Sequence, residues 1–281
     1  MLTIGMPVYD DFDGVFFTIQ SIRLNCPDMN IQFVVIDNNP TSADGKATKK
    51  FIETEVMGKY VEYTERIGTS IKNEIFKHSE TKFTLCIDCH ILLPQESIEA
   101  LIEFYMENPL TEDLIQGPLV SNSLTHRYTH FNENWGSLMH GQWDFDEVQY
   151  KRGKPFEIKS MGMGLFSCRT EVWPEFHSLM KGFGGEEGYI HKKFMKRGSK
   201  CLCIPQLQWV HRFDRPRGIP YPNIAEDRLW NYFIGAFDIY GNFTHSYISE
   251  IKMNFANILP ELTINHIYNT AVNEYITFSN K

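Results

Sequence analysis

The sequence predicts an α/β protein with a mostly parallel central sheet that helices flank. Near-continuous apolar runs rich in β-branched residues occupy 2–9, 31–36 and 83–88, and segments with helical spacing separate them. Buried parallel strands have such runs, and their alternation with helices is typical of βαβ units. The 281 residues, 42% of them hydrophobic, are enough for a large core.

The N-terminal half continues this alternation element by element. The first strand ends in the loop DDFDG, and a helix follows that ends before Cys26-Pro27. The second strand ends at Asn-Asn-Pro. We then expect a helix near 44–57, a strand at 60–63, a helix near 68–78, a strand at 83–88 and a helix at 95–107.

The second half is less regular. LIQGPLV predicts a strand, whereas residues 121–155 are polar, aromatic and irregular, which in a compact domain usually marks a functional segment or a wrong assignment. The run SMGMGLFSC is followed by a helical pattern over TEVWPEFHSL. A glycine turn then begins a helix with Ile190, Phe194 and Met195 on one side. KCLCIPQLQWVHRF predicts one or two short strands, and three helical segments with a break at Pro260 complete the chain.

Composition and charge narrow the functional classes. A net charge of −8 argues against a protein whose main partner is a nucleic-acid backbone. The N-terminus MLTIGMPVYDD has no signal-peptide pattern, and no run of about 18 apolar residues predicts a membrane span. Six cysteines, scattered and partly inside apolar runs, do not suggest a disulfide framework. We therefore expect a soluble, cytoplasmic protein.

Polar side chains at the ends of predicted strands are the first candidates for a site. Asp37, Asp88 and His211 each follow an apolar run, and open α/β sheets bind ligands at the carboxyl ends of their strands. His90 lies two residues after Asp88, so both side chains face one side of an extended segment. Carboxylate and imidazole groups together suit Mn²⁺ or Mg²⁺. The competing role for a lone aspartate here is a helix cap or a turn.

The same segment, FTLCIDCHILL, also contains a C-x-x-C pair, Cys86 and Cys89. A redox pair needs its first cysteine at a helix N-terminus, and a structural zinc site needs a second pair at suitable spacing. Neither condition is met, so both cysteines are expected to be small buried hydrophobic residues. Cys89 is then expected to point away from the metal into the packing.

Five blocks of the sequence together resemble a known family. TIGMPVYDDFDGVFFTIQSI, VVIDNNP, RIGTSIKNEIFKHSETKFTLCIDCHILLPQESIEALIEF, MGMGLFSCRTEVW and GFGGEEGYIHKKF are similar, in this order, to nucleotide-sugar glycosyltransferases of the GT-A type. The likeness is to family-2 enzymes and especially to the polypeptide N-acetylgalactosaminyltransferases, which share an Asp-x-His and a later His. It implies a single Rossmann-like GT-A domain over 1–222, with a nucleotide-binding half 1–110 and an acceptor half 111–222. Residues 223–281 are expected to form helices that pack on the sheet or make an oligomer contact.

The resemblance implies roles on the nucleotide side of the site. The first strand would contact the nucleoside through Pro7, Val8 and Tyr9. Asp37 would bind the nucleobase, which is uracil for a UDP-sugar donor. The segment that lines the nucleotide and sugar would include Arg66 and residues from Gly68 to Asn73.

The resemblance also implies the metal, sugar and phosphate contacts. Asp88, His90 and His211 would hold Mn²⁺ against the diphosphate. Met163 and Gly164 would approach the sugar, since glycine lets a backbone come close to a ligand. The segment HRFDRPRGIPYP would close over the phosphates through Arg212, Arg215, Arg217 and Tyr221.

The acid pair Glu186 and Glu187 in GFGGEEGYI bears on the mechanism. Its ordinary role would be that of acids stabilised at a helix N-terminus. By the resemblance, the second acid is the general base of inverting relatives, which leaves both retaining and inverting chemistry open. We expect transfer of a sugar to a hydroxyl of a glycan, protein or small molecule. The alternatives are a hydroxymethylated DNA base as acceptor, and a non-catalytic nucleotide-sugar binding module or a nucleotidyltransferase.

Overall fold

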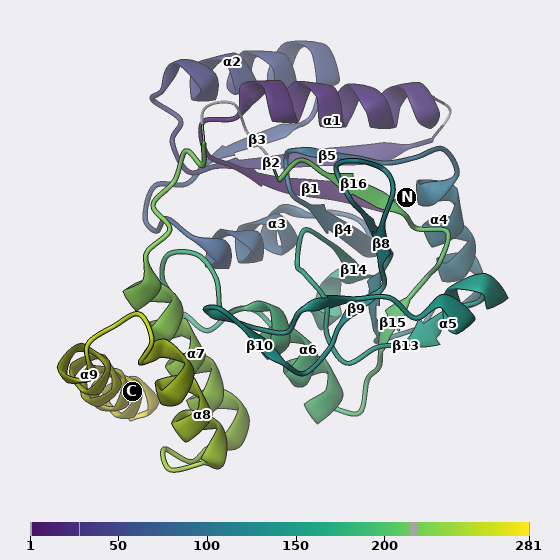
Figure 1. The fold of residues 1–281 in the computed structure, drawn as a ribbon. Coiled ribbons are helices and arrows are strands. Elements are labelled where there is room, and N and C mark those ends of the chain that lie inside the picture. The colour runs from purple at the N-terminus through teal and green to yellow at the C-terminus, as the bar shows by residue number, and fades with distance from the viewer. Residues whose placement is uncertain (1, 28, 214–217, 281) are drawn as a thin grey trace.

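The computed structural model describes residues 2–27, 29–213 and 218–280. Its largest sheet has the strand order β13-β15-β6-β14-β4-β1-β2-β3 (Figure 1). Four neighbouring strands of this sheet are parallel: β1 (Leu2–Val8), β2 (Ile31–Asp37), β3 (Lys59–Glu62) and β4 (Phe83–Ile87). The predicted βαβ series is therefore confirmed.

The other half of this sheet is mixed. β14 (Leu165–Arg169) runs antiparallel to β4 and to β6 (Leu114–Gln116). β15 (Cys201–Cys203) is parallel to β6, and β13 (Phe156–Glu157) is antiparallel to β15 at the edge. The sheet is mostly parallel, as predicted. Because β14 runs antiparallel to β4, the segment that precedes β14 lies at the carboxyl end of β4, beside the segment that follows β4.

Helices cover both faces of the parallel strands. Figure 1 shows α1 (Phe12–Asn25) and α2 (Ala43–Phe51) on one face and α3 (Lys72–His78) on the other. α3 packs against β1 at Gly5, where a Cβ would lie 2.0 Å from the Ile75 side chain. The π-helix η1 (Ile52–Val56) extends α2, the 3-10 turn η2 (Thr69–Ile71) precedes α3, and α4 (Ser97–Glu107) follows β4.

The segment 121–155, expected to be irregular, forms short strands and one short helix. A second sheet has the order β5-β16-β7-β8, from Ile91–Leu92, Trp209–His211, Leu119–Val120 and Arg127–Tyr128. Two further strand pairs follow, β9 (His130–Phe131) with β12 (Trp143–Asp144) and β10 (Trp135–Gly136) with β11 (Met139–His140), and then α5 (Glu147–Arg152). Two-residue strands are too short for an alternating pattern to show in the sequence.

The prediction of a helix over TEVWPEFHSL is wrong. Only a 3-10 turn, η3 (Thr170–Val172), is present. Pro174 lacks the N–H that a helix interior needs, and Glu175 has a positive φ of 59°. In the next helix, α6 (Glu187–Lys196), Ile190 and Phe194 are fully buried as expected, whereas Met195 is 38% exposed.

Three helices complete the described chain, as predicted: α7 (Ala225–Tyr240), α8 (Ser246–Phe255) and α9 (Glu261–Ser279), the last beginning after Pro260. Phe233 and Phe237 of α7 are fully buried in the same core cluster as the sheet. Among the described residues, no helix is long and apolar enough to span a membrane.

Candidate active site

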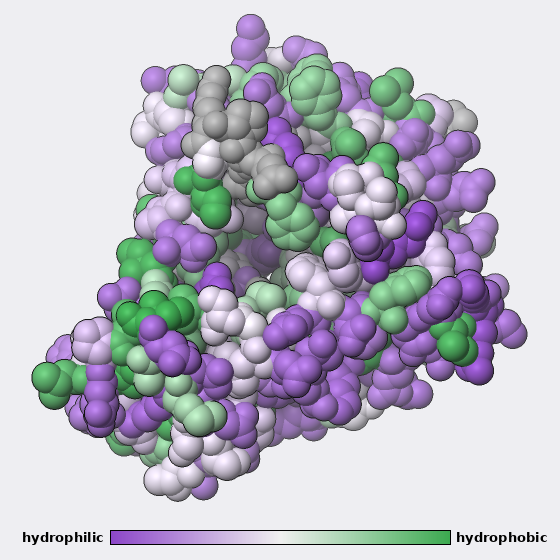
Figure 2. Space-filling model, in the orientation of Figure 1, coloured by the Kyte–Doolittle hydropathy of each residue, from purple (hydrophilic) through white to green (hydrophobic). Residues whose placement is uncertain are grey.

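A cavity of about 320 Å³ opens at the carboxyl ends of β1 and β4. Figure 2 shows it as a hollow in the middle of the surface. One wall comes from β1 and the turn between β4 and β5, and the facing wall comes from the glycine turn before α6 and from α7. The lining residues are Pro7, Val8, Tyr9, Asp11, Asn38, Gly68, Thr69, Ile71, Lys72, Asp88, Cys89, His90, Phe183, Gly184, Glu186, His211, Phe213, Ile219, Tyr221, Asn223 and Arg228.

The structure brings Asp88, His90 and His211 together. Their candidate ligand atoms all lie within 4.8 Å of one another, and His211 Nε2 is 3.5 Å from Asp88 Oδ2. Strand pairing produces this arrangement, because β16 runs antiparallel to β5 with His211 opposite Ile91. The backbone N–H of Asp88 also donates to the Gly164 carbonyl at 2.9 Å, which fixes the turn that carries the carboxylate.

This group of side chains fits a divalent cation. One carboxylate and two imidazoles supply oxygen and nitrogen donors and leave coordination positions for a ligand's phosphate oxygens. In His211 the nitrogen beside the carboxylate is Nε2, 3.5 Å from Asp88 Oδ2, whereas Nδ1 is buried and has no hydrogen-bond partner among the described residues.

Lys72, which the sequence reasoning included only within the stretch from Gly68 to Asn73, lies beside this group. Its side chain is 7% exposed, and its ammonium lies 3.2 Å from Asp88 Oδ1 and donates to the Met163 carbonyl at 2.7 Å. Burial would lower the pKa of Lys72, but the charge of Asp88 outweighs it and raises the pKa. Burial likewise would raise the pKa of Asp88, yet Lys72 and then His211 hold it well below its usual value.

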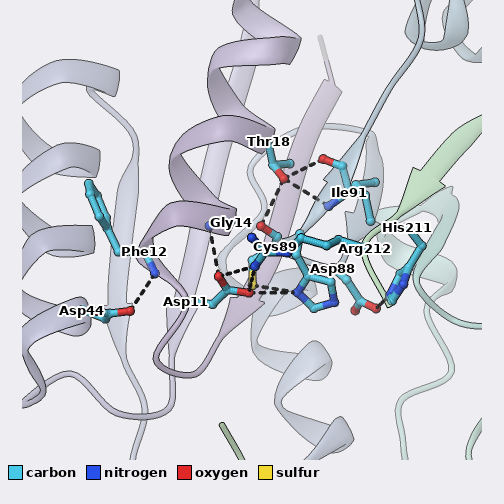
Figure 3. Close-up of polar contacts among 11 residues, drawn as sticks. Asp11, Phe12, Gly14, Thr18, Asp44, Asp88, Cys89, Ile91, His211 and Arg212 are labelled. Atoms are coloured by element: carbon cyan, nitrogen blue, oxygen red, sulfur yellow. Dashed lines mark hydrogen bonds and ion pairs between the residues drawn. The ribbon is translucent and has the colours of Figure 1, made fainter. Parts of the chain in front are cut away.

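Asp11 is a residue that the sequence reasoning missed. It caps α1 by accepting from the Gly14 N–H, it accepts from Arg212 Nη2 at 2.7 and 2.9 Å, and its Oδ2 lies 3.4 Å from His90 Nδ1 (Figure 3). Burial would raise the pKa of Asp11, but His90 and Arg212 outweigh it and lower the pKa to about 2. The predicted phosphate contact Arg212 is therefore paired with Asp11.

On the nucleotide side, the structure places some predicted residues at the cavity and others away from it. The predicted contacts Pro7, Val8, Tyr9 and Gly68 line it.

Asp37 is fully buried, where it accepts from the Tyr60 hydroxyl at 2.7 Å and from the Asn39 N–H; burial raises the pKa of Asp37. The next residue, Asn38, lines the cavity instead.

Two further predicted contacts on this side hold other parts of the chain. Arg66 is exposed and donates to the Ser178 carbonyl. Asn73 Oδ1 accepts from Trp173 Nε1 and from the Phe176 N–H. The position of a polar residue in the sequence can predict that it lies near a site. The direction of its side chain, by contrast, depends on the partners that tertiary packing supplies.

Met163 and Gly164, the predicted sugar contacts, lie just behind the cavity wall. Met163 is 3% exposed and reaches the site through its carbonyl, which binds Lys72. A Cβ on Gly164 would lie 2.8 Å from Trp209 and 3.0 Å from Asp88 Oδ2. Glycine is needed here because the backbone packs directly against the candidate metal group.

The opposite wall includes one acid of the predicted pair. Glu186 lines the cavity and is 8% exposed, and Glu187 is the first residue of α6. The preceding Gly182, Gly184 and Gly185 all have positive φ, so this turn depends on glycine. The N–H of the residue after Gly68 donates to the Gly182 carbonyl at 2.9 Å, which ties the turn to the nucleotide side.

α7 contributes to this wall from the C-terminal helices. Arg228 lines the cavity, and a Cβ on Gly184 would lie 2.3 Å from its Nε. Asn231 is 1% exposed; its amide donates to the Lys181 and Gly184 carbonyls and accepts from the Lys181 N–H. A polar residue inside the apolar run LWNYFIGAF was the signal in the sequence for this contact.

The segment after β16 completes the rim. Tyr221 lines the cavity and stacks on Phe183 with ring centroids 4.0 Å apart, and Phe213 and Ile219 also line it. The predicted contacts Arg215 and Arg217 lie outside the described residues.

Fold and cavity together define an α/β protein with a ligand site at the carboxyl ends of its strands. The model of glycosyl transferase family 2 matches residues 3–169, more than half of the chain. The chain therefore belongs to glycosyl transferase family 2, and its fold is the GT-A fold predicted from the sequence. No curated protein sequence matches the chain.

Solved structures share this fold at low sequence identity. GalNAc-T7, solved with UDP, GalNAc and Mn²⁺, is 15% identical with a TM-score of 0.66 over 96% of this chain, which spans about half (54%) of that protein. S. aureus TarS 1–349 with UDP-GlcNAc is 14% identical with a TM-score of 0.55, over 99% of this chain and 73% of that one. The mannosyltransferase PcManGT from Pyrobaculum calidifontis, with GDP-Man and Mn²⁺, is 14% identical with a TM-score of 0.57, over 98% and 75%.

Proposed function

We propose that this protein transfers a sugar from a nucleotide-diphospho-sugar, with UDP as the nucleotide, to an acceptor hydroxyl in a metal-dependent reaction. The observation that carries the proposal is the convergence of Asp88, His90 and His211 on one side of a cavity at the strand ends. Similar structures contain UDP or a UDP- or GDP-sugar, and two of them also contain Mn²⁺, which supports both the donor class and the ion.

The chain's own residues fit departure of a nucleoside diphosphate. When bound, Mn²⁺ would neutralise charge that develops on the diphosphate as the sugar–phosphate bond breaks. Lys72 holds Asp88 Oδ1 at 3.2 Å, so that carboxylate presents Oδ2 on the side of His211. The stacked Phe183 and Tyr221 at the rim would keep water, a competing acceptor, away from the donor.

The wall opposite the metal group would receive the acceptor. Glu186 faces the cavity, and Glu187 is the proposed general base that deprotonates the attacking hydroxyl in an inverting reaction. In a retaining reaction the departing phosphate would take the proton instead. The anomeric configuration of the product, determined by NMR, distinguishes the two routes, and Glu187→Gln with nearly full activity would exclude the base role.

The acceptor is proposed to be a hydroxyl of a glycan, a protein or a small molecule, and the transferred group a hexose or an N-acetylhexosamine. A nucleic-acid acceptor is not favoured, because the net charge is −8. A salt-sensitive association with DNA would reverse this preference.

A donor screen tests the proposal. UDP- and GDP-sugars are incubated with the protein and Mn²⁺, and release of the nucleoside diphosphate is measured, with Asp88→Ala as the control. We expect Mn²⁺-dependent release from at least one UDP-sugar, and its loss in Asp88→Ala. No release from any donor, together with no binding of a nucleotide sugar in calorimetry, would refute the proposal.

A further inference from the structure

We propose that Asp11 is a positioning residue that orients His90 for metal binding and connects it to the segment after β16 through Arg212. The inference rests on the proposed metal-dependent function. Asp11 is the residue before α1 and lies outside the Asp-x-His segment itself, so nothing in that motif assigns it a role.

One face of α1 is built against the turn that carries His90. Asp11, Gly14 and Thr18 are spaced by three and four residues and therefore lie on the same side of the helix. The Thr18 hydroxyl contacts Cys89 and Ile91, lying 3.1 Å from the first carbonyl and 2.7 Å from the second.

The closest approach of the helix to this turn is at Gly14. A Cβ on Gly14 would lie 2.7 Å from the Cys89 carbonyl, so only glycine permits this distance. Figure 3 shows Asp11, Gly14 and Thr18 next to this turn. The beginning of α1 is thus a rigid support directly behind a candidate metal ligand.

Asp11 contacts one ring nitrogen of His90, Nδ1, and leaves the other for a metal. Its Oδ2 lies 3.4 Å from His90 Nδ1, which leaves Nε2 as the ring nitrogen for a metal. A histidine that binds a metal through one nitrogen commonly donates the other N–H to a carboxylate, and this contact fixes both the tautomer and the ring orientation. Asp11 is 8% exposed, so water competes little for the contact.

The same carboxylate connects the two histidine segments. Arg212 Nη2 contacts both oxygens of Asp11, at 2.7 and 2.9 Å, and the Arg212 backbone N–H donates to the His90 carbonyl at 3.2 Å. His211 is the residue before Arg212. Asp11 therefore contacts one histidine ligand directly and holds the other through its neighbour.

Asp11, Cys89 and His90 also form a group that could hold a metal by composition and distance. The arginine argues against an ion there, because the guanidinium of Arg212 already lies against both carboxylate oxygens of Asp11. A cation between Asp11 and Cys89 would face this positive charge at short range. Orientation of His90, rather than a second metal site, is the role that these contacts support.

The test measures Mn²⁺ affinity directly. Wild-type protein and Asp11→Asn are titrated with Mn²⁺ in the presence of UDP, and free Mn²⁺ is followed by electron paramagnetic resonance. Asparagine keeps the helix cap and the size of the side chain but removes the charge. We expect Asp11→Asn to bind Mn²⁺ about 10- to 100-fold more weakly, the range for loss of an outer partner of a metal ligand.

Asp44→Asn is the matched control. Asp44 accepts from the Phe12 N–H at 3.2 Å at the same helix end. Among the described residues it makes no hydrogen bond or ion pair with His90 or Arg212. Its Mn²⁺ affinity should stay within about twofold of the wild type. Equal Mn²⁺ affinity of Asp11→Asn and wild type overturns the inference, as does an equal loss in Asp44→Asn.

The outcomes also separate this inference from the proposed function. Wild-type protein that binds no Mn²⁺ with UDP refutes the metal-dependent function and the role of Asp11 together. Wild-type binding that Asp11→Asn retains refutes the role of Asp11 alone. If Asp11→Asn lowers the unfolding midpoint, Arg212→Gln, which leaves the cap intact, should still weaken Mn²⁺ binding; unchanged binding overturns the proposed connection.

Discussion

The two walls of the cavity are built by different means. The metal wall is held by charged side chains: Lys72 pairs with Asp88, and Asp11 pairs with both His90 and Arg212. The acid wall is held by backbone. Its glycine turn has three residues with positive φ, and the amide of Asn231 binds the turn's main chain.

This difference indicates what each wall can tolerate. The metal wall brings several like and unlike charges together, so loss of one partner leaves another charge uncompensated. The acid wall depends on the exact path of a glycine backbone, so it is sensitive to volume and to the position of α7. Residues 3–169 match the family and contain most of the metal wall, whereas α7 lies outside that match.

The largest expected effect is loss of a metal ligand. His90→Ala should reduce Mn²⁺-dependent kcat/KM by more than about 100-fold, because loss of even an outer partner of such a ligand costs 10- to 100-fold. Nucleotide release at donor concentrations well below KM measures the change. Activity close to wild type would remove His90 from the metal wall.

Lys72→Met tests the charge balance of that wall. It leaves Asp88, whose side chain is 24% exposed, without its cation, and should lower the free energy of unfolding by about 1–3 kcal/mol in EDTA. Because Mn²⁺ would then supply the missing positive charge, it should raise the unfolding midpoint of this variant more than that of the wild type. Equal shifts would show that Lys72 and the metal group act independently.

Asn231→Ala tests the acid wall alone. Removing the amide leaves the Lys181 N–H and the Lys181 and Gly184 carbonyls without this partner, which should cost about 1–3 kcal/mol of stability. We expect a roughly tenfold lower kcat, since misplaced reacting groups reduce rates, with unchanged Mn²⁺ affinity. Asn254→Ala, at a partly exposed position of α8, is the control and should match the wild type. A parallel loss of Mn²⁺ affinity in Asn231→Ala would show that the walls are not separate.

The smallest effect is expected at the cysteines. Cys86→Ala and Cys89→Ala remove buried side chains from the core, and each should leave Mn²⁺-dependent kcat/KM within a fewfold of wild type. The structure sharpens this test, because Cys89 Sγ lies 3.4 Å from His90 Nδ1 rather than pointing away from it into apolar packing alone. A large loss of activity in Cys89→Ala would give the thiol a role in the metal wall.

Much of the metal wall could be predicted because α/β folds gather ligand-binding groups at the carboxyl ends of their strands, although β16 lies in the second sheet and reaches the site by pairing with β5. Asp88 and His90 follow one apolar run and His211 follows another, and the structure brings all three within ligand distance. Lys72 was not singled out, since a lysine at the start of an ordinary helical pattern resembles a solvated one. Asp37 differs: its place at a strand end is as predicted, but Tyr60 and Asn39 bind its carboxylate.

The sequence by itself determined the order of strands and helices in the N-terminal half, the three C-terminal helices, the glycine positions of the acid turn and the strand ends at which polar groups gather. These features follow from local periodicity and from backbone conformation, which depend on neighbouring residues. Only the tertiary structure decided that Asp11 meets Arg212, 201 residues away, and that Asn231 holds the acid turn. Such contacts depend on how distant segments pack, and local periodicity does not specify which partner a buried polar group contacts.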